Sequence, residues 1–154
     1  CDLYMDVYDP ADGSETSVNG VEKPLVIFMF GGGFIRGTRD DESYNEWFRM
    51  LTQNGYRVVS IDYRLGLKGS KKVGVAQVNV LDKAIHMAVE DLFSATNFLI
   101  ENAEELGINP GNIVILCPDH HRIVHKAKAV FNFELHQFEY ENAKVDPLMF
   151  NLHL

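Results

Sequence analysis

Three consecutive glycines, Gly31, Gly32 and Gly33, are the residues whose type and spacing most directly suggest chemistry. Because glycine has no Cβ and tolerates positive φ angles, such a run lets backbone N–H groups approach a ligand closely. Donors of this kind can hold the oxyanion of an acyl-transfer intermediate. A phosphate site is less favoured, because neither a P-loop lysine nor G-x-G-x-x-G spacing is present. The glycines alone leave two interpretations open, an oxyanion loop and a flexible tight turn.

Cysteine and histidine side chains near residue 120 are the other candidate groups. Cys117 could be a nucleophile if His120 or His121 served as its base, although a buried, unreactive cysteine is the commoner role at the end of an apolar run. His121 and His125 are spaced i, i+4 and could share a metal ion on a helix, but the Glu of H-E-x-x-H is missing. The sequence therefore predicts no cofactor and no resident metal, and a His-ligated metal protein is the least favoured of the functions considered.

Apolar runs alternate along the chain with segments of helical periodicity, and together they predict the strands and helices that position these groups. Three runs are apolar at most positions, as in strands buried on both faces of a parallel sheet. These runs are residues 25–30, 56–63 and 112–116. Residues 43–54 and 80–106 have apolar side chains at helical spacing and are followed by Gly55 and Gly107, which favour helix ends. We therefore predict an α/β fold with a mostly parallel sheet flanked by helices.

The remaining segments before residue 112 are predicted to be an edge strand, a loop and a turn. Residues 3–8 alternate between apolar and polar side chains, which suits an edge strand. Residues 9–23 are rich in Asp, Gly, Ser and Asn and are predicted to be a loop, and residues 109–111 a turn. Asp62 and Arg64 stand two positions apart at the end of the second inner run, where we expect them to form a structural ion pair.

The order of these motifs resembles the α/β-hydrolase esterases and lipases, in the carboxylesterase and hormone-sensitive-lipase-like branches. The resemblance covers residues 3–116. It rests on Gly31-Gly32-Gly33-Phe34 after one buried strand, Asp62-Tyr63-Arg64-Leu65-Gly66 after the next, Glu90-Asp91 in the long helix, and Asn112-Ile113-Val114-Ile115. It implies a partial α/β-hydrolase fold, a small ester as the substrate of intact relatives, and an oxyanion loop in which Phe30 takes the place of a usual His.

The same resemblance implies that the catalytic machinery is incomplete. In this family the third inner strand leads into G-x-S-x-G, the strained turn that carries the serine nucleophile. This chain instead has Cys117-Pro118-Asp119-His120-His121, in which Pro118 offers no N–H to an oxyanion. The acid and His of the triad normally come later in the chain than this sequence extends. We therefore expect a chain of the carboxylic-ester hydrolase lineage that does not turn over esters.

Residues 117–154 form an atypical tail. All twelve glycines lie at or before Gly111. The tail can be drawn as a helix over residues 123–138, with Ile123, Ala127 and Phe131 on one face, which would make it a remodelled partner-binding segment. A frame slip near residues 115–117 is the other hypothesis, since reading the codons of residues 116–122 one base early permits Ser-Gly-Ser-Ser-Ser. The non-catalytic alternative is a binding module on the same core.

Charge and hydropathy limit the partners. The net charge of −8 argues against nucleic acid, because neutralising phosphates needs clustered Lys and Arg. The longest apolar run, residues 25–30, is too short to span a bilayer. No signal peptide is visible and the sequence starts at Cys1, so the compartment stays unknown. An open sheet edge or the apolar tail predicts self-association.

Overall fold

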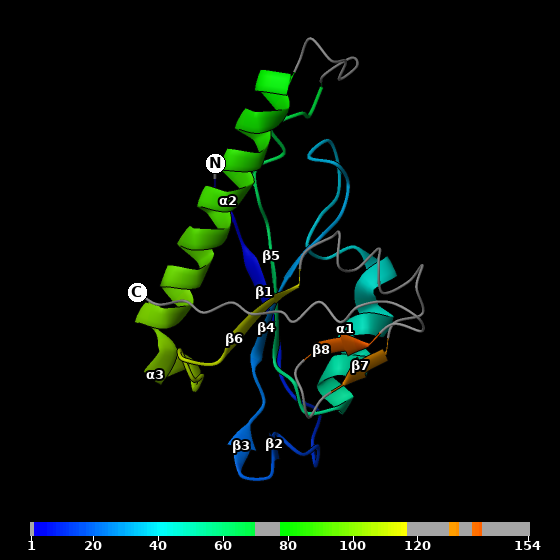
Figure 1. Cartoon of the computed structure of the whole chain (residues 1–154), viewed down its shortest axis with the longest axis vertical. Coiled ribbons are helices and arrows are strands. Elements are labelled where there is room, and N and C mark those ends of the chain that lie inside the picture. Colours follow the sequence, from blue (N-terminus) through cyan, green and yellow to red (C-terminus); the bar gives the residue numbers. More distant parts are fainter. Residues whose placement is uncertain (1, 70–77, 117–129, 133–136, 140–154) are drawn as a thin grey trace. The chain divides into compact units, whose positions relative to one another are not determined.

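The computed structural model of the chain describes residues 2–69, 78–116, 130–132 and 137–139. The chain divides into two compact units, Cys1–Ile115 and Leu116–Leu154. The three inner strands predicted from the sequence, together with the edge strand before them, make one four-stranded sheet (Figure 1).

The sheet has the strand order β1-β5-β4-β6. Its strands are β1 (Met5–Tyr8), β4 (Leu25–Met29), β5 (Val58–Ile61) and β6 (Ile113–Leu116). β4 pairs in parallel with β5, with Val26 opposite Val58, whereas β1 pairs antiparallel to β5, with Met5 opposite Ile61. The mostly parallel α/β sheet is therefore confirmed, and β1 is the predicted edge strand.

Two helical connections join the inner strands. After β4 come a short 3₁₀ helix η1 (Glu42–Tyr44) and α1 (Asn45–Gln53), and after β5 come α2 (Val78–Glu101) and α3 (Ala103–Leu106). The predicted helix over residues 80–106 is thus interrupted at Asn102, whereas Gly55 and Gly107 take the left-handed φ angles of 78° and 60° that end helices. Figure 1 shows α1 and α2 on opposite sides of the sheet.

Apolar side chains of β4 form the centre of the core. All five strand residues and the following Phe30 are buried, with exposed fractions of 9% or less. On the α1 side, Phe28 meets the ring of Phe48 edge-on at 5.1 Å, and Tyr8 lies 4.6 Å from Phe48 between ring centroids. Burial on both faces explains why this strand is apolar at every position instead of alternating.

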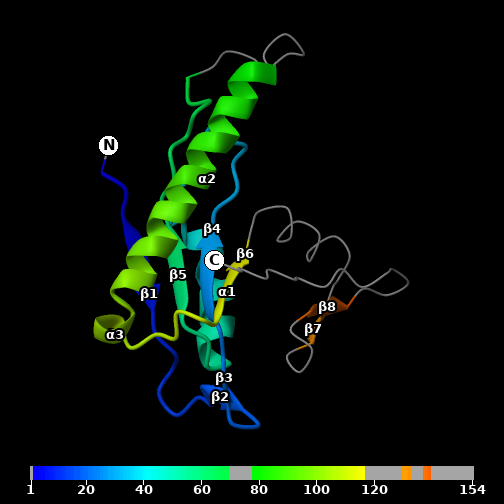
Figure 2. The same ribbon diagram turned by 60° about the vertical axis from the view of Figure 1, so that its left-hand side comes forward.

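The sheet changes direction of winding at β4. The chain leaves β4, passes through α1 and returns on one side of it as β5, and then crosses through α2 to the other side as β6 (Figure 2). In open α/β sheets ligands bind beyond the carboxyl ends of the strands at such a switch point. The fold therefore directs attention to the residues that follow β4, the glycines.

The predicted loop over residues 9–23 contains a hairpin that the sequence analysis missed. β2 (Ser17–Val18) pairs antiparallel with β3 (Val21–Glu22). The two residues between them, Asn19 and Gly20, have φ angles of 52° and 78°. Positive φ at both central residues is the requirement of a type I′ turn, for which Asn-Gly is the strongest sequence signal.

Burial along β6 is lower than predicted. Ile113, Val114 and Ile115 are half-buried, and Leu116 is buried. Within the described ranges β6 is hydrogen-bonded to β4 alone, so one side of the strand is an edge of the sheet. The expectation of a fully buried third strand is therefore wrong for its first three residues.

The described part of the tail is a strand pair. β7 (Val130–Asn132) pairs antiparallel with β8 (Gln137–Glu139), with Phe131 opposite Phe138. A helix over residues 123–138 is thus wrong at residues 130–132 and 137–138, because Val and Phe favour strands and the antiparallel pairing satisfies their backbone groups locally. No helix in the described ranges has the length and apolar character needed to cross a membrane.

Candidate functional site

The glycine loop leaves the carboxyl end of β4 in a backbone bend that glycine permits. Gly32 has a φ of 147° and Gly33 a φ of 64°, and Phe34 follows with a φ of 62°. The Ile35 N–H donates to the Gly32 carbonyl at 3.2 Å, and the Leu67 N–H donates to the Phe34 carbonyl at 2.9 Å. These bonds hold the bend against the segment after β5. The first bond closes a tight turn within the loop, and the second ties the loop to the segment after β5.

Close packing leaves no room for a side chain at two glycines of the loop, Gly32 and Gly37. A Cβ on Gly32 would lie 1.8 Å from the Arg36 carbonyl oxygen, and a Cβ on Gly37 would lie 2.5 Å from the Phe30 ring. A Cβ on Gly33 would meet nothing within 4 Å. Gly32 and Gly37 are therefore required because a side chain would collide with neighbouring atoms, whereas glycine at position 33 is favoured by its positive φ alone.

The three candidate donors differ in how they are engaged. The Gly31 N–H donates to Tyr44 Oη at 3.2 Å. In the described part of the chain, the N–H groups of Gly32 and Gly33 donate to no protein acceptor, and both residues are exposed. Two neighbouring amides are thus open to an incoming oxygen, while Gly31 is already bonded within the protein.

Tyr63, the second residue after β5, contacts Phe30, the residue before the glycines. Its hydroxyl donates to the Phe30 carbonyl oxygen at 2.6 Å, and its ring stacks on the Phe30 ring at 4.3 Å and 23°. Burial raises the pKa of Tyr63 to about 12, with a further contribution from nearby Tyr44. The phenol therefore stays protonated and able to donate at neutral pH.

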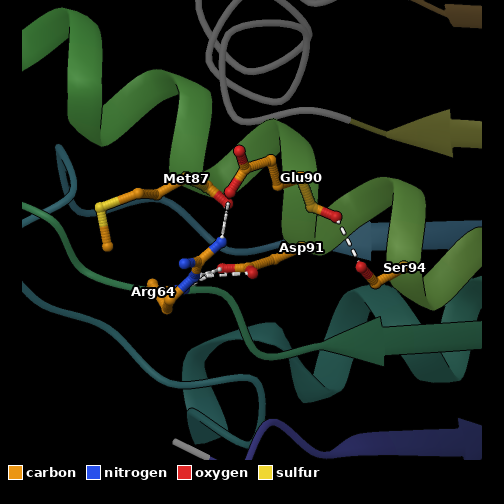
Figure 3. Close-up of polar contacts among 5 residues, drawn as sticks. All are labelled: Arg64, Met87, Glu90, Asp91 and Ser94. Atoms are coloured by element: carbon orange, nitrogen blue, oxygen red, sulfur yellow. Dashed lines mark hydrogen bonds and ion pairs between the residues drawn. The ribbon is translucent and has the colours of Figure 1, made fainter.

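Arg64 anchors the segment after β5 to α2 (Figure 3). Its Nε donates to both carboxylate oxygens of Asp91, at 2.8 and 3.0 Å, and its backbone N–H donates to Asp91 Oδ2 at 2.7 Å. A second guanidinium nitrogen bonds Glu90 Oε2 at 2.8 Å. These two carboxylates raise the pKa of Arg64 above its already high ordinary value, chiefly through their hydrogen bonds.

The predicted ion pair between Asp62 and Arg64 is wrong. Asp62 Oδ2 instead accepts from Arg39 at 2.8 Å, and Arg39 also pairs with Asp6 of β1 at 3.0 Å. Arg64 turns toward α2, where the buried carboxylate of Asp91 offers two acceptors. Both residues do form structural ion pairs, but each does so with another element.

Several sequence candidates lie outside the described residues. These are Cys117, His121 and His125. Within the described ranges no three His, Cys, Asp or Glu side chains gather as a metal-binding group. The sequence analysis missed Tyr44 and Tyr63 as residues that bond the glycine loop. Tyr44 lies within the predicted helix over residues 43–54 and Tyr63 ends the second inner run, and no local pattern shows that both hydroxyls reach one peptide.

Comparisons with known proteins agree with the α/β-hydrolase fold. Residues 5–117 match the BD-FAE family. The structure of Est2, a thermophilic esterase from Thermogutta terrifontis, is similar with a TM-score of 0.52 and 26% identity, over 76% of this chain and 35% of the esterase.

Two curated relatives, an esterase and a polyketide synthase, match part of the chain. Gut esterase 1 of Caenorhabditis briggsae is 29% identical over 92 residues, which are 60% of this chain and 16% of that protein. The non-reducing polyketide synthase ausA of Emericella nidulans is 34% identical over 98 residues, which are 64% of this chain and 3% of the synthase. The chain thus spans a small part of these two relatives. From the family match, the sheet and the esterase neighbours together, the chain belongs to the BD-FAE family and to the carboxylesterase lineage of the α/β-hydrolase fold.

Proposed function

We propose that this chain forms the oxyanion side of an esterase active site. The observation that carries the proposal is the pair of N–H groups on Gly32 and Gly33, which have no acceptor in the described chain and lie at the carboxyl end of β4. When a serine oxygen attacks an ester, the carbonyl oxygen becomes negative, and donors fixed in advance stabilise it without reorganising. The substrate class is a small carboxylic ester.

Catalytic incompleteness is the second part of the proposal. The position that follows β6 is where an α/β-hydrolase carries its serine elbow. This chain has Cys117, Pro118 and Asp119 there, with no Ser, Thr or Gly through Arg122. Loss of the nucleophile typically costs about 10⁶-fold in kcat. The chain by itself is therefore expected not to turn over esters.

An ester-hydrolysis assay on the purified chain tests the second part. The substrate is p-nitrophenyl butyrate, and Est2 of Thermogutta terrifontis, which has been solved phosphorylated by paraoxon, is the positive control. We expect the background rate and, after paraoxon treatment, an unchanged intact mass. Turnover that survives Cys117→Ala and is abolished by paraoxon would refute catalytic incompleteness.

Binding of a carboxylate tests the oxyanion role without needing catalysis. Butyrate is added to ¹⁵N-labelled protein, and the amide resonances of Gly32 and Gly33 are followed against those of Gly13, which lies in a distant turn. We expect saturable shifts at Gly32 and Gly33 only, with sodium chloride of equal ionic strength as the control. Equal shifts for butyrate and chloride would contradict the proposal.

The tail from residue 117 onward is proposed to be foreign to the family, by a frame slip or by remodelling. The family match supports this, because it stops at residue 117. The coding DNA across residues 112–129 decides between the two origins. Codons that cannot spell the serine elbow when read one base early would exclude a frame slip and leave remodelling.

Self-association through β6 is a second candidate function. Ile113, Val114 and Ile115 are half-buried on a strand that pairs on one side only within the described residues. An unpaired apolar edge is a template for another strand, here that of a second copy. Sedimentation should show a dimer that Val114→Lys dissociates, whereas Val21→Lys, on the β2–β3 hairpin, leaves it intact. A monomer at all concentrations would refute this candidate.

A further inference from the structure

One peptide group, the one joining Phe30 to Gly31, is held at both of its polar ends by tyrosine hydroxyls. Tyr63 Oη donates to the Phe30 carbonyl oxygen at 2.6 Å, and the Gly31 N–H donates to Tyr44 Oη at 3.2 Å. The C=O and N–H of a trans peptide share one plane and point in opposite directions. Bonds at both ends therefore restrict the rotation of that plane.

We propose that Tyr63 and Tyr44 are positioning residues that aim the N–H groups of Gly32 and Gly33. The inference rests on the proposed oxyanion role of these two amides. The clamped peptide is the last fixed unit before Gly32, and glycine imposes little steric restriction on its own φ and ψ. Without the clamp, the direction of the next amides would depend on the glycines alone. With it, the bend begins from a fixed plane.

The rings themselves are held in place, which makes their hydroxyls usable as fixed points. Tyr63 is 5% exposed and stacks on Phe30 at 4.3 Å. Tyr44 meets Phe28 edge-on at 4.8 Å and lies 6.3 Å from Phe48. Packed aromatic side chains have few rotamers left to lose, so a hydrogen bond from them orders its partner at small further entropic cost.

A hydrogen bond from the backbone of Arg64 to α2 also fixes the position of Tyr63. The Arg64 N–H belongs to the peptide that joins Tyr63 to Arg64, and it donates to Asp91 Oδ2 at 2.7 Å (Figure 3). The Arg64 side chain holds the same carboxylate through two further bonds. Since Asp91 belongs to α2, the backbone of Tyr63 is tied to the helix that covers the sheet. Phe30 carries no polar side-chain atom, so the hydroxyls of Tyr44 and Tyr63 supply the polar hold on its peptide.

Residual dipolar couplings measure the direction of an N–H bond directly and so test the clamp. The variants are Tyr63→Phe, Tyr44→Phe and the double variant, each of which removes hydroxyls but keeps the rings. Tyr56→Phe is the matched control, because Tyr56 is 3% exposed and its pKa is also raised to about 12 by burial. The full ¹⁵N-labelled chain is aligned in a dilute medium, and the couplings of Gly32 and Gly33 are compared with those of β4 and β5.

We expect the double variant to change the couplings at Gly32 and Gly33 while those of the strands and of the control stay constant. In Tyr44→Phe the Gly31 amide should exchange with solvent roughly three- to tenfold faster, as expected for one lost hydrogen bond. Unchanged couplings in the double variant would overturn the proposal. If that variant does not fold, the same criterion applies to Tyr63→Phe, which retains the stacked ring.

Butyrate binding separates the clamp from the proposed function. If the two hydroxyls aim the amides of Gly32 and Gly33, the double variant should bind butyrate roughly three- to tenfold more weakly than the parent chain. If butyrate binds the parent chain, equal affinity in the double variant would overturn the clamp. Couplings that change while butyrate shifts neither amide in the parent chain would support the clamp and refute the oxyanion role.

Discussion

Replacing Gly32 by Ala should destabilise the protein far more than the same change at its neighbour Gly33. Both residues have positive φ angles, 147° and 64°, and both lie in the exposed glycine loop. They differ in the space available, because a Cβ on Gly32 would lie 1.8 Å from the Arg36 carbonyl oxygen whereas a Cβ on Gly33 meets nothing within 4 Å. The pair therefore separates backbone crowding from backbone conformation.

The magnitudes follow from these two contributions. A non-glycine residue at the φ of Gly32 costs about 1–3 kcal/mol. Forcing a methyl group against a fixed backbone oxygen adds about 1–3 kcal/mol, so Gly32→Ala should cost about 2–6 kcal/mol in total. Gly33→Ala bears the left-handed penalty alone, about 1–2 kcal/mol, and alanine offsets about 0.4–1 kcal/mol of it by reducing the freedom of the unfolded chain.

Urea unfolding followed by tryptophan fluorescence measures the difference. Trp47 is the only tryptophan and lies in α1, so it reports on the unit that contains the loop. At a slope of about 2 kcal/mol/M, the midpoint should fall by about 1–3 M for Gly32→Ala and by about 0.8 M or less for Gly33→Ala.

Equal losses at the two positions would refute the reasoning, because they would show that the Arg36 carbonyl yields without cost. A loss confined to Gly33→Ala would contradict the geometry of the loop itself. If Gly32→Ala does not fold at all, Gly37→Ala supplies the second measurement, since its Cβ would lie 2.5 Å from the Phe30 ring and 2.7 Å from the Gly31 carbonyl oxygen. A smaller loss is expected there than at Gly32.

Three further predictions concern the surroundings of the loop. Asp91→Asn should lower Tm more than Glu90→Gln in thermal unfolding. Both carboxylates bond Arg64, but the Asp91 side chain is 6% exposed and that of Glu90 is 68% exposed. Equal shifts in Tm would contradict a dominant role for the buried carboxylate. The pKa of Tyr63 is raised to about 12 by burial, so its contribution to stability is fully present below the ordinary value of 10.0 and is lost as pH rises toward 12. Chemical unfolding of the parent chain and Tyr63→Phe between pH 9 and about 11.5 should show a smaller pH dependence in the variant. Phe48→Ala should lower the free energy of unfolding by about 3–5 kcal/mol and Met50→Ala should change it little, since Phe48 is 2% exposed and Met50 46% exposed. Similar urea midpoints for the two variants would refute the assigned core.

Local patterns were sufficient for much of the fold. The unbroken apolar run of β4 predicted a strand covered on both faces, and Gly55 and Gly107 predicted where helices end, because these features depend on residues adjacent in the chain. The Asn19-Gly20 pair could have predicted the β2–β3 hairpin in the same way. The helix drawn over residues 123–138 is wrong where the two strands lie, because Val and Phe at helical spacing are equally compatible with short strands.

Partners distant in sequence were decided by the tertiary structure. Asp62 and Arg64 are two residues apart, yet one turns to Arg39 and the other to Asp91, because their side chains meet different elements. Nothing in the sequence shows that the Gly31 N–H donates to Tyr44 while those of Gly32 and Gly33 have no acceptor among the described residues.

The sequence by itself determined that a glycine bend follows an inner strand, since strand and bend are both properties of contiguous residues. Only the tertiary structure decided that the bend lies at the switch point of the sheet and begins from a peptide clamped by two tyrosines. The physical reason is that a hydrogen bond depends on distance and angle in space, and the crossover through α1 and the return along β5 bring together groups that are 13 and 33 residues apart in the chain.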